Sequence, residues 1–202
     1  MKIQMDLTGV QLETDRLILR PFRQEDLEDF YAYASVPGVG EMAGWPHHQS
    51  IETTKSVLSM FMEEKNVWAL QLKENGRVIG SLGFHGSWAN SDERYKELRI
   101  CEIGYVLSKN YWGRGLMPEA VRAAIRFAFD SLHLDALAVC HFTDNAQSRR
   151  VIEKCGFTFC QKDFFQLKYD TRQVEEMQYI LLRPEREQAD GRERPEALGQ
   201  PD

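Results

Sequence analysis

Residues 110–120 read Asn-Tyr-Trp-Gly-Arg-Gly-Leu-Met-Pro-Glu-Ala and form a glycine-rich junction between two regular segments. A strand-like run, Cys101–Leu107, comes before the junction, and a helical run, Leu116–Ser131, begins within it. Gly113 and Gly115 allow the backbone to approach a ligand closely. The first N–H groups of a helix are unpaired and lie at its positive end. The junction therefore predicts a binding site for a phosphate or pyrophosphate group.

Two common phosphate-binding motifs do not fit this junction. A P-loop requires Gly, four residues and then Gly-Lys-Ser/Thr, and the chain contains no such string. A dinucleotide-binding fingerprint requires a third glycine where this chain has Pro118, and it usually opens a βαβ unit. Because a Gly-x-Gly pair alone is also typical of an ordinary tight turn, the interpretation needs a second element.

Residues 145–157 supply that second element. They predict a helix with Asp144 or Asn145 as its N-cap and with Gly156 placed to end it in a left-handed turn. A short apolar strand, Ala136–Phe142, precedes the helix.

These segments together resemble the GNAT superfamily of acyl-CoA-dependent N-acetyltransferases. In that family a Gln/Arg-x-x-Gly-x-Gly/Ala motif binds the pyrophosphate of coenzyme A; Gly113 and Gly115 match it, whereas Asn110 departs from its first position. The branch that acetylates the N-termini of ribosomal proteins is more similar still. The matching segments are residues 12–21, 103–107, 111–120 and 145–157. The resemblance extends over about residues 10–183 and implies an α+β (mixed α/β) fold, in which helices flank a twisted, mostly antiparallel central sheet.

The resemblance also implies a cosubstrate, acetyl-CoA, and no metal. The strand at residues 105–107 would pair with the pantetheine arm, and the backbone amides of residues 112–117 would bind the pyrophosphate. Asn145 matches a family asparagine that hydrogen-bonds the pantetheine, and Ser148 matches a hydroxyl residue near the thioester sulfur. The residues expected to bind the cofactor are Tyr105, Val106, Leu107, Trp112, Gly113, Arg114, Gly115, Leu116, Met117, Asn145 and Ser148.

Direct acetyl transfer requires a deprotonated amine, a stabilised oxyanion and a protonated leaving sulfur. Glu102 is the candidate general base. A carboxylate is unusual in an otherwise apolar strand, and burial there would raise its pKa toward the range that a base requires. The alternative is a structural carboxylate paired with Arg99 or Arg122.

The proton donor is less defined by the sequence. Many family members carry a tyrosine on the helix at residues 145–157, and this chain has none there. Either Ser148 serves the leaving thiolate, or Tyr105 or Tyr111 reaches it from another segment. Ser148 is therefore the second candidate catalytic residue. For Glu119, which also matches a family position, we expect stabilisation of the first helical turn.

The bulk properties restrict the partners. The chain has 202 residues and a net charge of −6, of which residues 184–202, with six acids and three arginines, carry −3. This composition predicts a disordered acidic tail after a single acetyltransferase domain, residues 1–183. A mildly acidic body suits a cationic amine and argues against nucleic-acid binding. No apolar run approaches the ~20 residues of a membrane span, and the N-terminus lacks a secretory signal, so we expect a cytoplasmic monomer or homodimer without membrane contacts.

The predicted reaction is acetyl transfer to the N-terminal α-amine of a protein or peptide. Two alternatives stay open: a small-molecule amine such as a polyamine, amino acid or antibiotic, and a regulatory module that binds acyl-CoA without turnover. Two segments are candidates for the acceptor cleft, residues 44–48 and the loop at residues 88–95. The four cysteines show no metal-binding spacing and are interpreted as small apolar residues.

Overall fold

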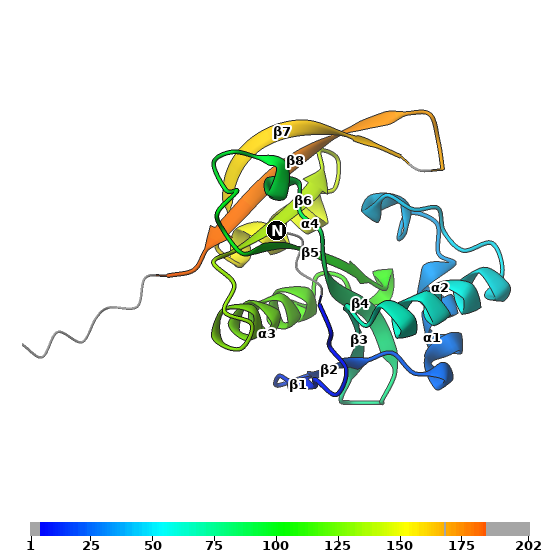
Figure 1. Cartoon of the computed structure of the whole chain (residues 1–202). Helices are drawn as coiled ribbons and strands as arrows, with labels where there is room; N and C mark the ends of the chain where they lie inside the picture. The colour runs from blue at the N-terminus through cyan, green and yellow to red at the C-terminus, as the bar shows by residue number, and fades with distance from the viewer. Residues whose placement is uncertain (1–4, 168, 185–202) are drawn as a thin grey trace, which may run out of the picture.

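Eight strands form one mixed sheet in the order β1-β2-β3-β4-β5-β6-β8-β7, with helices on both faces (Figure 1). The computed structural model describes residues 5–167 and 169–184, so the predicted acidic tail lies outside the described residues apart from Pro184. The strands are β1 (Leu12–Glu13), β2 (Leu17–Pro21), β3 (Val67–Leu72), β4 (Val78–His85), β5 (Ile100–Leu107), β6 (Ala136–Phe142), β7 (Thr158–Gln166) and β8 (Gln173–Leu182). The helices are α1 (Leu27–Ala34), α2 (Ile51–Glu64), α3 (Leu116–Asp130) and α4 (Ala146–Lys154), with short 3-10 turns η1 (Gln24–Asp26), η2 (Glu41–Ala43), η3 (Trp88–Ser91) and η4 (Lys109–Tyr111).

The predicted mixed α/β fold with a mostly antiparallel sheet is confirmed. Strand β6 begins and ends at the predicted residues. The helical segment at residues 24–34 is divided into η1 and α1, because Asp26 turns its side chain back to accept a hydrogen bond from the Arg23 N–H, at 2.7 Å. In the described part of the chain, no helix is both long enough and apolar enough to cross a membrane.

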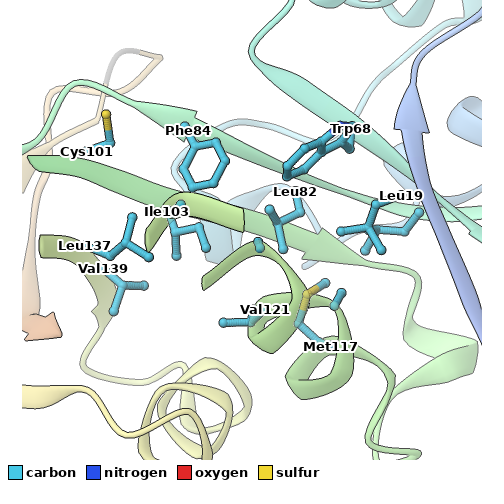
Figure 2. Packing of buried hydrophobic residues seen from close by; sticks show 14 of the residues in the cluster. Leu19, Trp68, Leu82, Phe84, Cys101, Ile103, Met117, Val121, Leu137 and Val139 are labelled. Carbon is cyan, nitrogen blue, oxygen red and sulfur yellow. The ribbon is translucent and has the colours of Figure 1, made fainter. Parts of the chain in front are cut away.

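The alternation of side chains along the strands divides the core into two layers. On one face, α3 packs with residues such as Val121 against apolar residues of β2 to β6, among them Leu82 and Ile103 (Figure 2). On the other face, α1 and α2 cover β3 and β4 through a second cluster that includes Phe30 and Leu58. The same sheet therefore presents two different surfaces to its helices.

Strands β5 and β6 separate soon after they pair. They are the one parallel pair of the sheet, and their register covers only three residue pairs, which end at Glu102 opposite Ala138. A parallel pair requires a crossover connection, which here contains η4 and α3. From Ile103 to Leu107, β5 pairs only with β4, so its other edge is left open between the diverging strands.

A buried ion pair fixes the start of α1 against β2. Arg20 donates two hydrogen bonds to the Asp26 carboxylate, at 2.8 and 2.7 Å, and a third to Gln71 at 2.7 Å. Both charged side chains are almost completely buried. Because neither charge can be solvated, each depends on the other.

We expect Asp26→Asn to lower the free energy of unfolding by about 3 kcal/mol, because it leaves the Arg20 guanidinium buried without a counter-charge. Urea unfolding measures this loss. The control is Glu25→Gln at the exposed neighbouring position, where the change should stay within about 0.5 kcal/mol. Equal, small losses in both variants would contradict the argument.

Candidate active site

A cleft of about 540 Å³ passes through the sheet where β5 and β6 separate. Its walls come from the open edge of β5, the starts of α3 and α4, the diverging part of β6 and the η2 segment. Most of the residues predicted for the site line this cleft. They are Glu102, Tyr105, Val106, Leu107, Trp112, Gly113, Gly115, Leu116, Met117, Asn145 and Ser148.

The glycine turn at the start of α3 has the geometry of an anion site. Gly113 and Gly115 have φ angles of 77° and 75°, which only glycine adopts without strain. Gly115 is the N-cap of α3 and no side chain accepts from the helix N–H groups there. A Cβ atom added at Gly113 would meet nothing within 4 Å, so the space above the turn is open. The turn therefore fits a pyrophosphate group held by backbone amides.

The side chains of this segment support the turn from below. Leu116 and Met117 are buried in the core, so only their backbone atoms can serve a ligand. Trp112 donates its indole N–H to the carbonyl of Leu107 at 2.8 Å, which ties the turn to the end of β5. The guanidinium of Arg114 lies over the ring of Tyr111, 5.1 Å from its centroid, and Arg114 does not line the cleft.

Arg16 lies beside the turn, although it is distant in sequence. Its guanidinium donates to the Arg114 carbonyl at 2.9 Å and to the Glu119 carboxylate at 2.7 Å. Glu119 also accepts from the hydroxyl of Thr14, at 2.6 Å. Glu119 thus anchors the β1–β2 turn on α3, a role that its position in the first helical turn did not indicate.

Two predicted residues meet on the face of the sheet that carries α4. The hydroxyl groups of Tyr105 and Ser148 lie 2.9 Å apart. Burial raises the pKa of Tyr105, and the hydrogen bond with Ser148 opposes that shift. Asn145 is the N-cap of α4, as predicted: it accepts from the Ser148 N–H at 3.0 Å and donates to the carbonyl of Met42 at 3.1 Å.

Glu102 lies on the opposite face of β5. Side chains alternate along a strand, so Glu102 and Tyr105, three positions apart, point to opposite faces. The Cys140 thiol donates to Glu102 at 3.2 Å. Burial raises the pKa of Glu102 to about 7; the Cys140 hydrogen bond opposes this shift and the charge of Glu176 adds to it.

Neither arginine proposed as a partner of Glu102 contacts it. Arg99 donates its side chain to the carbonyl of His133, and Arg122 donates to the carbonyl of Lys154. Among the described residues, no ion pair includes Glu102. The alternative of an arginine-paired structural carboxylate is therefore wrong.

Three polar residues of the Glu102 face were not predicted from the sequence: His85, Cys140 and Glu176. His85 is the cross-strand partner of Glu102. Its ring lies over a pair of glycines, since a Cβ added at Gly83 or Gly104 would come within 3.2 Å of the imidazole. A glycine at each of these positions was a possible signal, because it marks a close approach within a strand.

The two segments expected to form an acceptor cleft have different outcomes. Trp45 lines the cleft, as do Met42 and Ala43 of the adjoining η2 segment. The loop at residues 88–95 does not line it, because Trp88 and Tyr95 pack on each other and on a separate small core. That part of the prediction is wrong.

The arrangement has the parts that amide-forming group transfer requires. A carboxylate with a pKa near neutrality lies on one face of β5 and a pair of hydroxyl groups on the other. Between them runs an open strand edge whose N–H groups can hydrogen-bond an extended ligand or polarise a carbonyl group. Within the described residues, no group of three or more His, Cys, Asp or Glu side chains is placed to hold a metal ion.

Comparison with known proteins identifies a family. A family model described as "Acetyltransferase (GNAT) domain" matches residues 16–158. A Bacillus subtilis (strain 168) protein named "Uncharacterized N-acetyltransferase YoaA" is 30% identical over 151 residues, which cover 72% of this chain and 81% of the relative. The "[Ribosomal protein uS5]-alanine N-acetyltransferase" of Escherichia coli (strain K12) is 24% identical over 159 residues, 73% of this chain and 78% of that protein.

A solved structure shares the fold. The crystal structure of an acetyltransferase (GNAT family) from Bacillus anthracis superposes with a TM-score of 0.73 at 22% sequence identity, covering 86% of this chain and 98% of the other.

We expect Glu102→Gln to stabilise the protein at alkaline pH. The pKa of Glu102 is raised from 4.5 to about 7, so the folded state holds this proton more tightly than the unfolded chain does. Below the pKa of Glu102 in the unfolded chain, this side chain is protonated in both the folded and the unfolded protein, so it does not destabilise the fold. As the pH rises through the pKa of Glu102 in the folded protein, the folded state must carry a buried charge, which lowers its stability. The free energy of unfolding of the variant should exceed that of the parent by on the order of 2 kcal/mol at about pH 8 and should equal it at about pH 4.5.

Denaturant unfolding at the two pH values measures this difference. A variant that is less stable than the parent at the higher pH would show that the Glu102 carboxylate is a stabilising structural group.

Proposed function

The chain belongs to the GNAT family of acetyl-CoA-dependent N-acetyltransferases, and from that premise we propose that its acceptor is the N-terminal α-amine of a protein or peptide. The observation that carries the proposal is the placement of Glu102 and of the Tyr105–Ser148 pair on opposite faces of β5, at the point where the sheet opens. An amine can reach one face of that strand while the cofactor lies against the other.

The proposed roles follow from this placement. Acetyl-CoA, when bound, supplies the thioester that the amine attacks. Glu102 accepts the proton of the acceptor's ammonium group, directly or through a water, and its pKa of about 7 suits a base that works near neutral pH. Ser148, hydrogen-bonded to Tyr105, donates a hydrogen bond to the departing thiolate, and the second proton that the amine nitrogen loses on forming the amide neutralises this thiolate.

The remaining predicted residues bind the cofactor in this proposal. The open edge of β5 at Tyr105, Val106 and Leu107 pairs with the pantetheine arm, and the amides of residues 112–117 hold the pyrophosphate. Asn145 keeps one amide hydrogen free beside the cleft after its bond to Met42, and this hydrogen can be donated to the arm.

The charge of the cleft favours a peptide over a free amino acid. Among the described residues that line it, none is lysine or arginine, and two, Glu102 and Glu176, carry carboxylates. A free amino acid or a phosphorylated acceptor would bring an anionic group that has no cationic partner here. A peptide N-terminus brings only its ammonium group and neutral amides. The ribosomal-protein acetyltransferase among the relatives supports this acceptor class.

A polyamine is the second candidate, and the same two carboxylates favour it. The cleft wall beyond them is apolar and aromatic, with Met42, Trp45, Phe142 and Phe165. Such a wall suits a small uncharged side chain at the first residue of a peptide better than a second ammonium group, which would lose its hydration there.

We expect CoA release with peptides that begin with a small neutral residue, and little release with free amino acids or with polyamines. A thiol assay over matched acceptors, each peptide paired with its N-terminally blocked form, makes this comparison. Turnover of polyamines with inert peptides would reverse the order of the two candidates.

The control for that assay is Glu102→Gln. The variant should lose at least about 100-fold in kcat and retain acetyl-CoA binding, because the carboxylate is placed for proton transfer and not for the cofactor. Normal turnover by this variant would remove Glu102 from the mechanism.

We expect Gly113→Val to abolish the micromolar binding of acetyl-CoA that calorimetry should detect for the parent. A side chain at this position enters the open space above the turn and strains a positive φ. Gly9→Val is the matched control, because Gly9 has a φ of 72° and equally open surroundings far from the cleft. Equal losses in both variants would attribute the effect to backbone strain alone.

A further inference from the structure

Glu176 is a buried carboxylate that the proposed chemistry does not use. It lies on β8, opposite Phe142 of β6, lines the cleft and is only 6% exposed. A carboxylate so far removed from water is costly unless a specific environment maintains it. The contacts that hold this buried side chain are therefore relevant to the reaction or to the fold.

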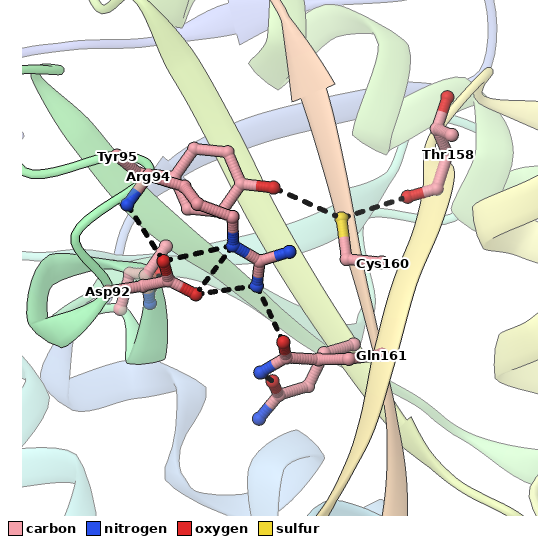
Figure 3. A network of polar contacts seen from close by, with 9 residues as sticks. Asp92, Arg94, Tyr95, Thr158, Cys160 and Gln161 are labelled. Atoms are coloured by element: carbon pink, nitrogen blue, oxygen red, sulfur yellow. Dashed lines mark hydrogen bonds and ion pairs between the residues drawn. The ribbon is translucent and has the colours of Figure 1, made fainter.

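A chain of hydrogen bonds ends at this carboxylate. Arg94 donates to the side-chain oxygen of Gln161 at 2.6 Å (Figure 3). Gln161 donates its amide N–H to the oxygen of Gln178 at 2.9 Å, and Gln178 donates to Glu176 at 2.7 Å. Because arginine can only donate, the direction of every later bond is determined, and the last link aims an N–H group at a Glu176 oxygen.

The backbone places the links of this chain. Gln161 and Gln178 are cross-strand partners because a β-bulge between Phe159 and Gln161 shifts the register of β7 against β8. At its outer end, Arg94 is held by Asp92 through bonds of 2.6 to 3.1 Å (Figure 3). The chain therefore runs from a surface ion pair to a residue of the cleft.

Glu176 and Glu102 face a common neighbour. The Cys140 thiol lies against both carboxylates, and burial together with these two charges raises its pKa. The thiol therefore stays neutral and can donate its single proton to only one of them, which is Glu102. Two like charges near one weak donor repel each other, so the charge of Glu176 raises the pKa of Glu102.

The other groups facing Glu102 add no opposing charge. They are His85 from β4 and the backbone of Trp88 from η3, which hydrogen-bonds Glu102. Desolvation lowers the pKa of His85, while Glu64 at the end of α2 has the opposite effect on it. The neighbouring charge that acts on Glu102 in the cleft is consequently that of Glu176.

We propose that Glu176 is a positioning residue for the reaction: the amide chain from Arg94 holds its carboxylate beside Cys140 and Glu102, where it favours transfer of the acceptor's proton to Glu102. The inference rests on the proposed role of Glu102 as proton acceptor. The Gln178 N–H group, 2.7 Å from a Glu176 oxygen, holds that side chain in its place on the cleft wall. The neighbouring charge raises the pKa of Glu102, which takes the proton from the acceptor amine.

The test is a titration of the full-length protein labelled with carboxyl ¹³C-glutamate and followed by NMR. The resonance of Glu102 is identified by its absence in Glu102→Gln. We expect Glu176→Gln to lower the midpoint of Glu102 by about one pH unit. The acidic limb of the kcat/KM profile should move to lower pH by the same amount.

Glu175→Gln is the matched control. Glu175 is the adjacent residue of β8 and points to the other face, where it bonds Thr143 and Lys162. Removal of this charge should change neither the titration midpoint of Glu102 nor the acidic limb of the kcat/KM profile. Gln178→Met removes the donor to Glu176 without a charge change and should move the midpoint in the same direction as Glu176→Gln, so it carries the test if that variant does not fold.

The outcomes separate this inference from the proposed function. A Glu102 midpoint that is unchanged in both Glu176→Gln and Gln178→Met overturns the role of Glu176, as does an equal shift in Glu175→Gln. If the titration midpoint of Glu102 shifts but the kcat/KM profile does not move with it, Glu102 is refuted as the base.

Discussion

The short parallel pairing of β5 with β6 is the constraint on which the site depends. Three residue pairs hold the two strands together, and beyond Glu102 each strand follows its own antiparallel neighbour. An unpaired strand edge inside a protein exposes backbone groups that must find partners. The split therefore creates the cleft and at the same time a row of donors and acceptors that an extended ligand can satisfy.

The period of two along β5 separates the chemistry of the two faces. Glu102 lies on the face where it contacts Cys140, whereas Tyr105 points toward α4 and meets Ser148. In the proposed mechanism, the proton acceptor and the hydroxyl pair are therefore kept apart by the thickness of one strand. The same separation would let the carboxylates of Glu102 and Glu176 act on an amine without contacting the phosphate groups expected at the start of α3.

The sequence predicted the local features of the site well, because they depend on residues close together in the chain. The glycine turn, the N-cap at Asn145 and the helices around them follow from turn and capping chemistry. Glu102 was found as a carboxylate out of place in an apolar strand. Cys140 and Glu176 gave no such signal, since a cysteine in an apolar strand and a glutamate in an alternating one are both ordinary.

By itself, the sequence determined the element types and the anion-binding turn, because propensity, periodicity and capping act over a few residues. Only the tertiary structure decided which polar side chains share the cleft. Arg94, Gln161, Gln178 and Glu176 are joined by the register of β7 on β8 and by one bulge, which strand pairing selects from many alternatives. The bonds from Arg94 to Gln161 and from Gln161 to Gln178 join residues 67 and 17 positions apart and exist only once that pairing is made, so no local sequence pattern predicts them.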